Sequence, residues 1–238
     1  MKGILLVDKP AGWTSFDVVN YVRKIVATAE GKKPKNVKVG HTGTLDPFAT
    51  GLLVLLVGKE YTKRAGEFSK LDKTYEVTMR LGETSTTGDP EGIISPYNHP
   101  ANASLFRRSS KLRQDLMEAT QKIVGEIEQV PPAYSAIKID GQRAYKLARE
   151  GKEVKIEPRK VTIHAIKLIS YDYPEVKLIA DVSSGTYIRT LVEDIGKTLG
   201  TGAYTTALRR TKVGAFEVEK ALKVENISTR ALERNLIS

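Results

Sequence analysis

The sequence predicts an α+β fold built on a mixed, mostly antiparallel central sheet with helices flanking it. Apolar stretches typical of strands recur along the chain. Stretches with helical spacing fall between them, but without the regular strand-helix-strand rhythm of a parallel sheet. The length of 238 residues and a hydrophobic content of 40% suffice for a large core, and we expect residues 1–238 to form a single domain.

The N-terminal third is predicted to contain strands around one amphipathic helix. Residues 3–7 form a buried strand, and residues 14–29 form a helix that Thr14 or Ser15 caps. A basic loop leads to a short strand, a polar loop and a second apolar strand at 52–57. Residues 73–81 alternate as a strand with Tyr75 on one face. The apolar, core-facing side of this amphipathic helix is predicted to carry Phe16, Val19, Val22, Ile25 and Val26.

The remaining segments alternate less regularly between helix and strand. Residues 82–100 are rich in loop residues, and the pattern predicts a helix at 109–124. Pro131 and Pro132 break the chain before a predicted strand at 134–139. Further predicted elements are a helix at 142–150, strands at 161–171 and 176–183, a helix at 187–199, and strands at 205–212 and 214–218.

The charge of the chain indicates a polyanionic partner. Lysine and arginine number 38 against 28 acids, which gives a formal net charge of +10. This surplus favours nucleic acid. No apolar run approaches the roughly 20 residues that a bilayer requires, so no membrane association is expected. The absence of cysteine fits the reducing cytoplasm, and the N-terminal apolar run is too short for a signal peptide.

Several common catalytic motifs fail. Gly196-Lys197-Thr198 resembles the end of a phosphate-binding loop, but Leu191 stands where the first glycine is required. The histidines, His41, His99 and His164, lack metal-ligand spacing, so no metal is expected. No serine-hydrolase elbow occurs. The polar loop offers one carboxylate where glycosidases usually need two.

That polar loop runs from Gly40 to Gly51 and carries a single acid, Asp46, directly before Pro47. Its glycines permit positive φ values and a close approach to a ligand, and the proline keeps Asp46 out of the helical region. Two interpretations remain open from the spacing. Asp46 is a reactive carboxylate, or Asp-Pro is an ordinary turn before a strand.

The loop resembles the catalytic signature of the TruB family of tRNA pseudouridine synthases, a Gly-His-x-Gly-x-Leu-Asp-Pro-x-Ala-x-Gly string. Further segments resemble other family blocks, in family order over nearly the whole chain. These segments are residues 6–12, 73–76, 131–138 with Gly141 and Tyr145, 184–190 and 208–210.

The resemblance implies isomerisation of a T-loop uridine of tRNA to pseudouridine, with no metal or organic cofactor. Asp46 is then the nucleophile, and attack on the sugar, addition to the uracil ring and assisted elimination all remain open. Tyr75 is a further catalytic residue, which stacks on the target base and can take part in proton transfer. Arg189 pairs with Asp46 and keeps it ionised, although an ion pair with Glu193 on the same helix is the alternative.

Other residues acquire roles from the same resemblance. His41 packs against the flipped nucleotide, and Tyr187 and Leu208 line the uracil pocket. Weaker candidates for contacts with the RNA are Lys9, Lys63, Arg209 and Arg210. An inserted subdomain at about 92–124 grips the tRNA through Arg107, Arg108, Lys111 and Arg113.

The resemblance also sets expectations about partners. The T-arm of tRNA is the expected partner, and no obligatory protein partner is expected. The family's C-terminal PUA-type RNA-binding domain is not expected in this chain. Two alternatives stay open: a non-catalytic RNA-binding or tRNA-folding protein, and a guide-RNA-dependent synthase of the dyskerin type.

Overall fold

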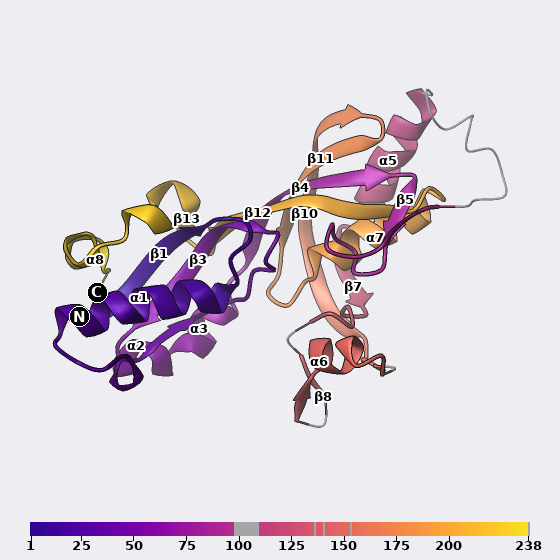
Figure 1. The fold of residues 1–238 in the computed structure, drawn as a ribbon. Coiled ribbons are helices and arrows are strands. Elements are labelled where there is room, and N and C mark those ends of the chain that lie inside the picture. Colours follow the sequence, from indigo (N-terminus) through magenta and orange to yellow (C-terminus); the bar gives the residue numbers. More distant parts are fainter. Residues whose placement is uncertain (98–109, 136, 140, 153, 238) are drawn as a thin grey trace. The chain divides into compact units, whose positions relative to one another are not determined.

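The computed structural model describes residues 1–97, 110–135, 137–139, 141–152 and 154–237 (Figure 1). The chain divides into two compact units, Met1–Tyr75 with Arg209–Ser238, and Glu76–Leu208. Both boundaries fall inside strands, β4 (Lys73–Leu81) and β12 (Ala203–Val213), so these two strands contribute residues to both units. The expectation of a single domain over 1–238 stays a prediction.

The first unit is built around strand β3 (Thr50–Val57). β1 (Gly3–Lys9) runs antiparallel to it, with Leu5 opposite Leu55, and β2 (Val39–His41) also pairs with it antiparallel. β12 pairs with β3 in parallel, with Arg210 opposite Gly51. The edge strands are β14 (Leu222–Lys223), parallel to β1, and β13 (Phe216–Glu217), antiparallel to β12.

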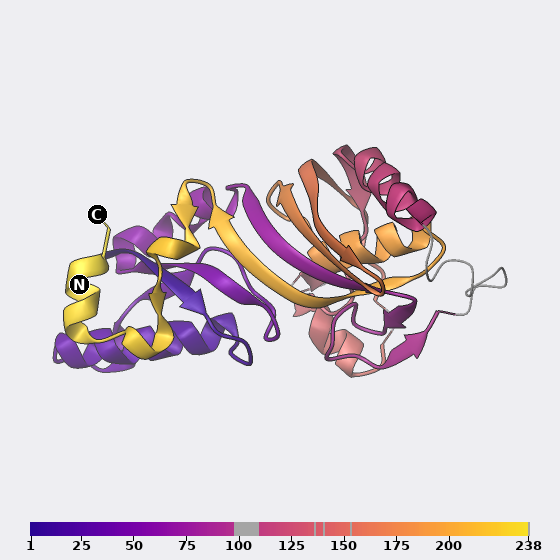
Figure 2. The ribbon, with the colours of Figure 1, turned by 90° about the horizontal axis from the view of Figure 1, so that it is seen from above.

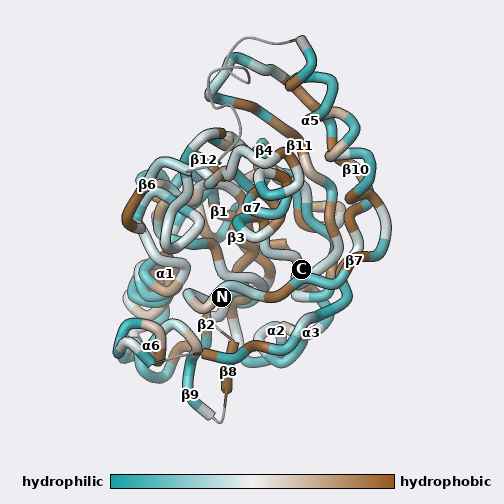
Figure 3. Tube along the Cα trace, turned by 90° about the vertical axis from the view of Figure 1, so that its right-hand side faces the viewer, coloured by the Kyte–Doolittle hydropathy of each residue, from teal (hydrophilic) through white to brown (hydrophobic). Residues whose placement is uncertain are grey.

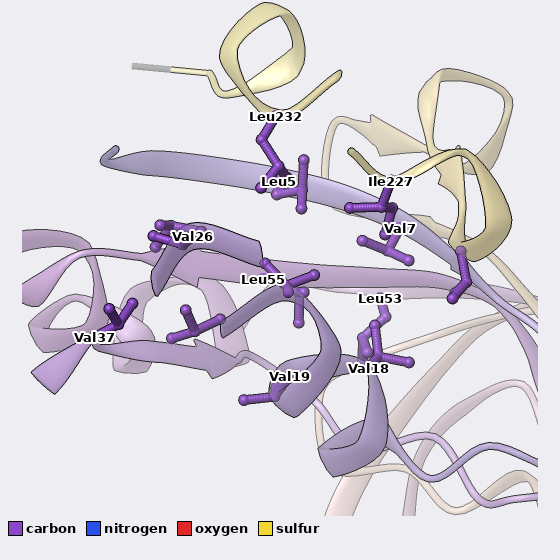
Figure 4. Close-up of a cluster of buried hydrophobic side chains, with 14 of the residues drawn as sticks. Leu5, Val7, Val18, Val19, Val26, Val37, Leu53, Leu55, Ile227 and Leu232 are labelled. Atoms are coloured by element: carbon purple, nitrogen blue, oxygen red, sulfur yellow. The ribbon is translucent and has the colours of Figure 1, made fainter. Parts of the chain in front are cut away.

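Both faces of β3 are covered, which explains its continuous apolar sequence. Leu53, Leu55 and Val57 belong to a cluster with helix α1 (Ser15–Ala29), while alternate residues belong to a cluster on the other face. Figure 4 shows the first cluster, in which side chains of α1 approach those of β1 and β3. The clustered α1 residues are Val18, Val19, Val22, Val26 and Ala27.

Helix α1 begins where the sequence predicts. The Thr14 side chain accepts a hydrogen bond from the Asp17 backbone, and the Asp17 carboxylate accepts one from the Thr14 backbone, which is a complete capping box. The assignment of Phe16 to the buried face was wrong, because 58% of Phe16 is exposed. Val18 occupies the buried stripe instead, one turn before Val22.

Short helices and the C-terminal segment complete the first unit. α2 (Lys59–Lys63) and α3 (Ala65–Ser69) follow β3, and the 3-10 turn η1 (Pro34–Asn36) precedes β2. After β13 come η2 (Val218–Lys220), η3 (Val224–Asn226) and α8 (Thr229–Asn235). The C-terminal segment, yellow in Figure 2, lies beside the N-terminal strand, where Ile4 and Ile237 form an antiparallel bridge.

The second unit has the strand order β12-β4-β11-β10-β7. β10 (Arg159–Asp172) pairs antiparallel with both β11 (Glu175–Val182) and β7 (Gly125–Gln129). Helix α5 (Ser110–Lys122) contacts β10 and helix α7 (Ile188–Thr198). Hydrophobic and hydrophilic residues alternate along the tube of α5 in Figure 3, and its Leu112 and Leu116 are buried.

Two predicted elements of the second unit differ from the structure. Among the described residues of the expected strand at 134–139, only Lys138–Ile139 (β8) is extended, and it forms a hairpin with β9 (Gln142–Arg143). The carbonyl oxygens of Tyr134 and Ser135 accept bonds from Arg189 and from the Tyr145 backbone instead of pairing in a sheet. The expected helix at 142–150 starts only at Ala144, as α6 (Ala144–Arg149).

The region of the expected RNA-gripping insertion is described in part. It contains β6 (Ile94–Pro96), which pairs with β5 (Glu83–Ser85), and helix α5. Arg107 and Arg108 lie outside the described residues. The gripping role of this region stays a prediction. Among the described residues, no helix combines the length and apolar composition that crossing a bilayer requires.

Candidate active site

Asp46 lies in the loop between β2 and β3 of the first unit, as the sequence predicts. Its side chain is half-buried, whereas Leu45 and Ala49 on either side are buried. The Ala49 amide donates to the Asp46 carbonyl oxygen at 3.1 Å and closes a turn around Pro47. The buried neighbours and this turn fix the backbone on both sides of the acid.

Lys9 connects this loop to the end of β1. The residue is fully buried, and its ammonium donates to the carbonyl oxygens of Pro10, Trp13 and Pro47 at 2.9, 2.7 and 3.2 Å. The Gly12 amide adds a bond to the same Pro47 oxygen at 2.9 Å. Lys9 therefore holds the loop, and its assignment as a candidate RNA contact was wrong because no surface is left to reach a phosphate.

Arg210 holds the opposite side of the loop. Only 2% of it is exposed, and its guanidinium donates to the carbonyl oxygens of Leu52, Gly43 and Thr44 at 2.8, 3.0 and 3.5 Å. Its assignment as an RNA contact was wrong for the same reason as that of Lys9. Gly51 permits the close approach of β12, because a Cβ atom there would lie 2.3 Å from the Arg210 carbonyl oxygen.

The start of helix α1 forms a third attachment. Ser15 Oγ donates to the Leu45 carbonyl oxygen at 3.1 Å, and the Leu45 amide donates to Ser15 Oγ at 2.8 Å. Both residues are buried. Three elements of the first unit, the end of β1, strand β12 through Arg210, and the start of α1, therefore bond to the loop that presents Asp46.

His41 and Tyr75 also belong to the first unit. His41 ends β2, directly before the loop, and is half-buried. Tyr75 lies on the buried face of β4 with 8% exposed. Lys73 lies two residues before Tyr75 on the same strand. Burial and the charge of Arg210 lower the pKa of Lys73 to about 8. His41 is thus on the strand that precedes the Asp46 loop and Tyr75 on a later strand, and their roles stay predictions.

Arg189 lies in the second unit, on the first turn of α7, and is 4% exposed. It donates to the Asp89 carboxylate at 3.0 Å, to the Thr87 carbonyl oxygen at 2.6 Å and to the Tyr134 carbonyl oxygen at 2.8 Å. The observed ion pair is therefore with Asp89, not with Glu193 on the same helix. Pairing with Asp46, which belongs to the other unit, stays a prediction.

Asp89 is a residue that the sequence interpretation missed. It is 4% exposed in its side chain, and its second oxygen accepts bonds from Thr87 Oγ1 at 2.6 Å and from the Glu91 amide at 3.0 Å. Gly88 precedes it with a φ of +73°. The sequence did hold a signal for Asp89, because Gly88-Asp89-Pro90 is a second Asp-Pro dipeptide. It lies in a region that was otherwise interpreted as loop.

Gln129 positions the start of α7. Its side-chain amide accepts a bond from the Tyr187 amide at 2.7 Å and donates to the Tyr187 carbonyl oxygen at 3.1 Å. Gln129 is 1% exposed, so these bonds are shielded from water. Tyr187 itself is half-buried, and Leu208 on β12 is buried with 7% exposed. The uracil-lining role of both residues stays a prediction.

The remaining basic candidates differ in exposure. Arg209 forms a two-bond ion pair with Asp8 at 2.9 and 2.8 Å, and its side chain is 36% exposed. Lys63 is exposed on α2. In the described part of the chain, no three acidic or histidine side chains gather as a metal site would require.

The fold and the loop define a class of protein. An α+β chain with a surplus of positive charge presents one carboxylate from a glycine-rich loop, and this loop is bonded to three neighbouring elements. These are the features of a pseudouridine synthase. Residues 30–188 match the model described as TruB family pseudouridylate synthase (N terminal domain), and residues 189–235 match tRNA pseudouridylate synthase B C-terminal domain. The chain belongs to the TruB family of pseudouridylate synthases.

Individual relatives agree with the family. A tRNA pseudouridine synthase B of Thermobifida fusca is 41% identical over 95% of this chain and 74% of its own length. One of Phocaeicola vulgatus is 42% identical over 94% of this chain and 90% of its own length. One of Pseudomonas aeruginosa is 45% identical over 95% of this chain and 69% of its own length.

A solved structure of a Cbf5-Nop10-Gar1 complex contains a chain of similar fold. Its TM-score is 0.66 at 26% sequence identity, over 94% of the present chain. The match covers 53% of that longer chain, so about half of the neighbour is similar to this protein. The likeness confirms the predicted fold class.

Proposed function

We propose that this protein isomerises uridine to pseudouridine in the T-loop of tRNA. The single observation that carries the proposal is the Asp46 loop, which combines the family signature with attachments by Lys9, Arg210 and Ser15. Relatives that are 41–45% identical over most of the chain are named tRNA pseudouridine synthase B, which supports tRNA as the substrate.

The reaction needs few groups on the enzyme. The bond between uracil N1 and the sugar C1′ breaks, the base turns, and a bond forms between C5 and C1′. The proton on C5 leaves and N1 gains one, so nothing is consumed. A stacked uridine must first be extruded from the RNA loop. Asp46 acts as the nucleophile, because a carboxylate that forms a covalent adduct divides one difficult step into two easier ones.

The other site residues bind and orient the base in this proposal. Tyr75 offers an aromatic face for stacking, and His41, Tyr187 and Leu208 surround the flipped nucleotide. Arg189 holds a positive charge in a buried position because Asp89 and two carbonyl oxygens satisfy it. We place Arg189 next to Asp46 in the complex with RNA.

The alternatives have less support. A guide-RNA-dependent synthase is favoured only by the fold likeness to the Cbf5 chain, at 26% identity against 41–45% for the tRNA pseudouridine synthase B relatives. A purely RNA-binding protein would not need a carboxylate in the tightly bonded loop. We therefore expect the chain to act on the T-arm of tRNA without a guide RNA or protein partner.

The test compares Asp46→Asn with wild type on an unmodified tRNA transcript. Turnover should fall at least about 10³-fold, because the amide cannot act as the nucleophile, while the transcript still binds. Asp17→Asn is the matched control: it also removes one carboxylate from the first unit but keeps an oxygen for the Thr14 cap. If Asp46→Asn turns over as fast as Asp17→Asn, Asp46 takes no part in the chemistry. If the wild-type protein forms no pseudouridine, the proposed function is refuted.

A further inference from the structure

The first unit contains an open, basic depression outside the Asp46 loop, which we name the α1 depression. It has a volume of about 440 Å³, and residues of α1, η1, β2 and α2 line it. The buried side chains of Val37 and Val39 are part of its wall. The charged residues that line it are all cationic: Arg23, Lys24, Lys35 and Lys38.

Nearby acids do not neutralise these cations. Glu30 pairs with Lys32 and with the N-terminal amine, and Glu60 pairs with Lys2 at 3.1 Å. Within the described residues, the ammonium groups of the three lysines of the depression form no hydrogen bond or ion pair. Four positive charges around one hollow therefore remain available to an anionic ligand.

Arg23 is held in place at the edge of the depression. Its guanidinium donates to Asn20 Oδ1 at 2.7 Å and to the Val39 carbonyl oxygen at 3.1 Å. These bonds use two of the five N–H donors that an arginine carries. The guanidinium also lies 5.7 Å from the centre of the Phe16 ring. Arg23 is thus already ordered for a further bond to a phosphate oxygen.

The depression is connected to the catalytic loop along α1. Phe16, Asn20 and Arg23 recur at helical spacing and share one stripe of the helix. Phe16 is exposed and follows Ser15, which bonds to Leu45 beside Asp46. Eight helical residues separate Ser15 from Arg23, a rise of about 12 Å. That length corresponds to roughly three or four steps of a stacked nucleic-acid strand at 3.4 Å each.

We propose that the α1 depression binds backbone phosphates of the substrate RNA, on the strand that continues away from the target uridine. The exposed face of Phe16 offers a stacking surface for a base between the catalytic loop and the depression. Arg23 and the three lysines bind the phosphates that follow. The inference rests on the proposed function for the identity of the RNA and adds a second contact surface to it.

The test neutralises the exposed lysines and leaves the ordered arginine in place. The triple variant Lys24→Gln, Lys35→Gln, Lys38→Gln is compared with Lys70→Gln, Lys220→Gln, Lys223→Gln, a control of equal charge change. All six lysines are exposed and belong to the first unit. Urea unfolding of each variant verifies that its fold is retained. The probe is an unmodified tRNA transcript, titrated by fluorescence anisotropy over a range of salt concentrations.

We expect the depression variant to bind the transcript about tenfold more weakly at 0.1 M salt. We also expect the slope of log Kd against log salt to decrease by about one for each lost phosphate contact, up to about three. The KM for pseudouridine formation rises in parallel. The control variant should change each quantity less than about twofold.

Two failures can be told apart. If wild type forms pseudouridine but both variants share the same salt slope and KM, the depression does not bind the substrate and the inference is overturned. If wild type forms no pseudouridine, the proposed function fails while the binding comparison still reports on the depression. A weaker affinity with an unchanged salt slope also overturns the inference, because the lysines then act through structure and not through phosphate contacts.

Discussion

Arg210 in the first unit and Arg189 in the second are both almost fully buried, yet their partners differ in charge. Arg210 donates to three carbonyl oxygens, two of them in the Asp46 loop. Arg189 donates to two carbonyl oxygens and to the carboxylate of Asp89. Carbonyl groups are neutral dipoles, so the bonds to Arg210 leave its charge uncompensated, whereas Asp89 compensates that of Arg189.

The two buried cations therefore have different structural roles. In the first unit Arg210 and Lys9 fix the backbone that presents Asp46, and their positive charges lie close to that loop. In the second unit the charge of Arg189 is balanced, and the guanidinium itself is the group that is positioned. Substitutions that remove one partner at a time should therefore affect the two units differently.

The largest effect is expected from Asp89→Asn. This change keeps the shape of the side chain but removes the carboxylate that pairs with the buried Arg189 guanidinium. Breaking a buried ion pair in this way costs about 3–5 kcal/mol, which urea unfolding would measure. Turnover should fall as well, because Arg189 loses its fixed position.

Two further variants sharpen that result. Asp8→Asn breaks the partly exposed pair with Arg209 and should cost no more than about 1 kcal/mol. Arg189→Met added to Asp89→Asn removes the stranded charge and should recover part of the lost stability. A double variant less stable than Asp89→Asn would show that the buried charge is not the source of the loss.

Arg210→Met should have the next largest effect. The change leaves the buried carbonyl oxygen of Leu52 and the half-buried one of Gly43 without their donor, at a cost of about 2–3 kcal/mol in the free energy of unfolding. The Asp46 loop loses an attachment, so turnover should fall even where the protein is folded. Arg209→Met, which removes the partly exposed bonds to Asp8 and Thr50, serves as the control for stability. Wild-type turnover in folded Arg210→Met protein would contradict the role of Arg210 in holding the loop.

Gly88→Ala and Gly12→Ala compare the two units at turns of similar backbone conformation, with φ of +73° and +79°. Both substitutions cost about 1–2 kcal/mol for the left-handed backbone. At Gly88 the added Cβ would also lie 2.6 Å from Glu193 Oε1 and 3.3 Å from Arg189 Cβ, while nothing lies within 4 Å at Gly12. We expect Gly88→Ala to be the more destabilising by about 1 kcal/mol in urea unfolding. Equal losses would mean that the side chains of α7 move aside.

The last expected effect is a pH dependence of stability at Lys73. Burial, assisted by the charge of Arg210, lowers the pKa of Lys73 from its ordinary 10.5 to about 8 in the folded protein. Between these values the unfolded chain binds more protons, so this residue makes stability rise with pH, by at most about 1.4 kcal/mol per pH unit. Below pH 8 its unfavourable contribution is constant.

Unfolding at pH 8 and pH 10 would measure that contribution. Lys73→Met should lack the rise in the free energy of unfolding between pH 8 and pH 10 that wild type gains from Lys73. Lys70→Met, at an exposed position, should keep this rise. Parallel pH profiles for wild type and Lys73→Met would show that Lys73 keeps an ordinary pKa in the folded state.

The sequence predicted most of the fold because hydrophobic spacing reports which face of an element is buried. The strand at Lys73–Leu81 and the helix capped by Thr14 follow directly from this pattern. Phe16 shows the limit of the argument, since an aromatic residue at helical spacing turned out to be exposed. The Asp46 loop was found from the family signature, whereas its spacing alone left an ordinary turn open.

The hydrogen bonds and ion pairs that hold the candidate site residues in place could not be predicted, because they join residues that are distant in the sequence. Asp89 and Arg189 are 100 positions apart, and Gln129 and Tyr187 are 58 apart. Lys9 and Arg210 misled the interpretation for a related reason. A basic residue suggests the surface, and only the folded chain shows that loop carbonyl oxygens surround these two.

The reciprocal bonds between Ser15 and Leu45 have a consequence for the opening motions of the first unit. The Leu45 amide proton, next to Asp46, is shielded from solvent exchange as long as the first turn of α1 remains closed. The Asp46 loop and the helix start therefore share one local opening event, with one free energy. A strand of RNA lying along α1 would reduce the frequency of that opening, and the reactive carboxylate would become most rigid when its substrate is in place.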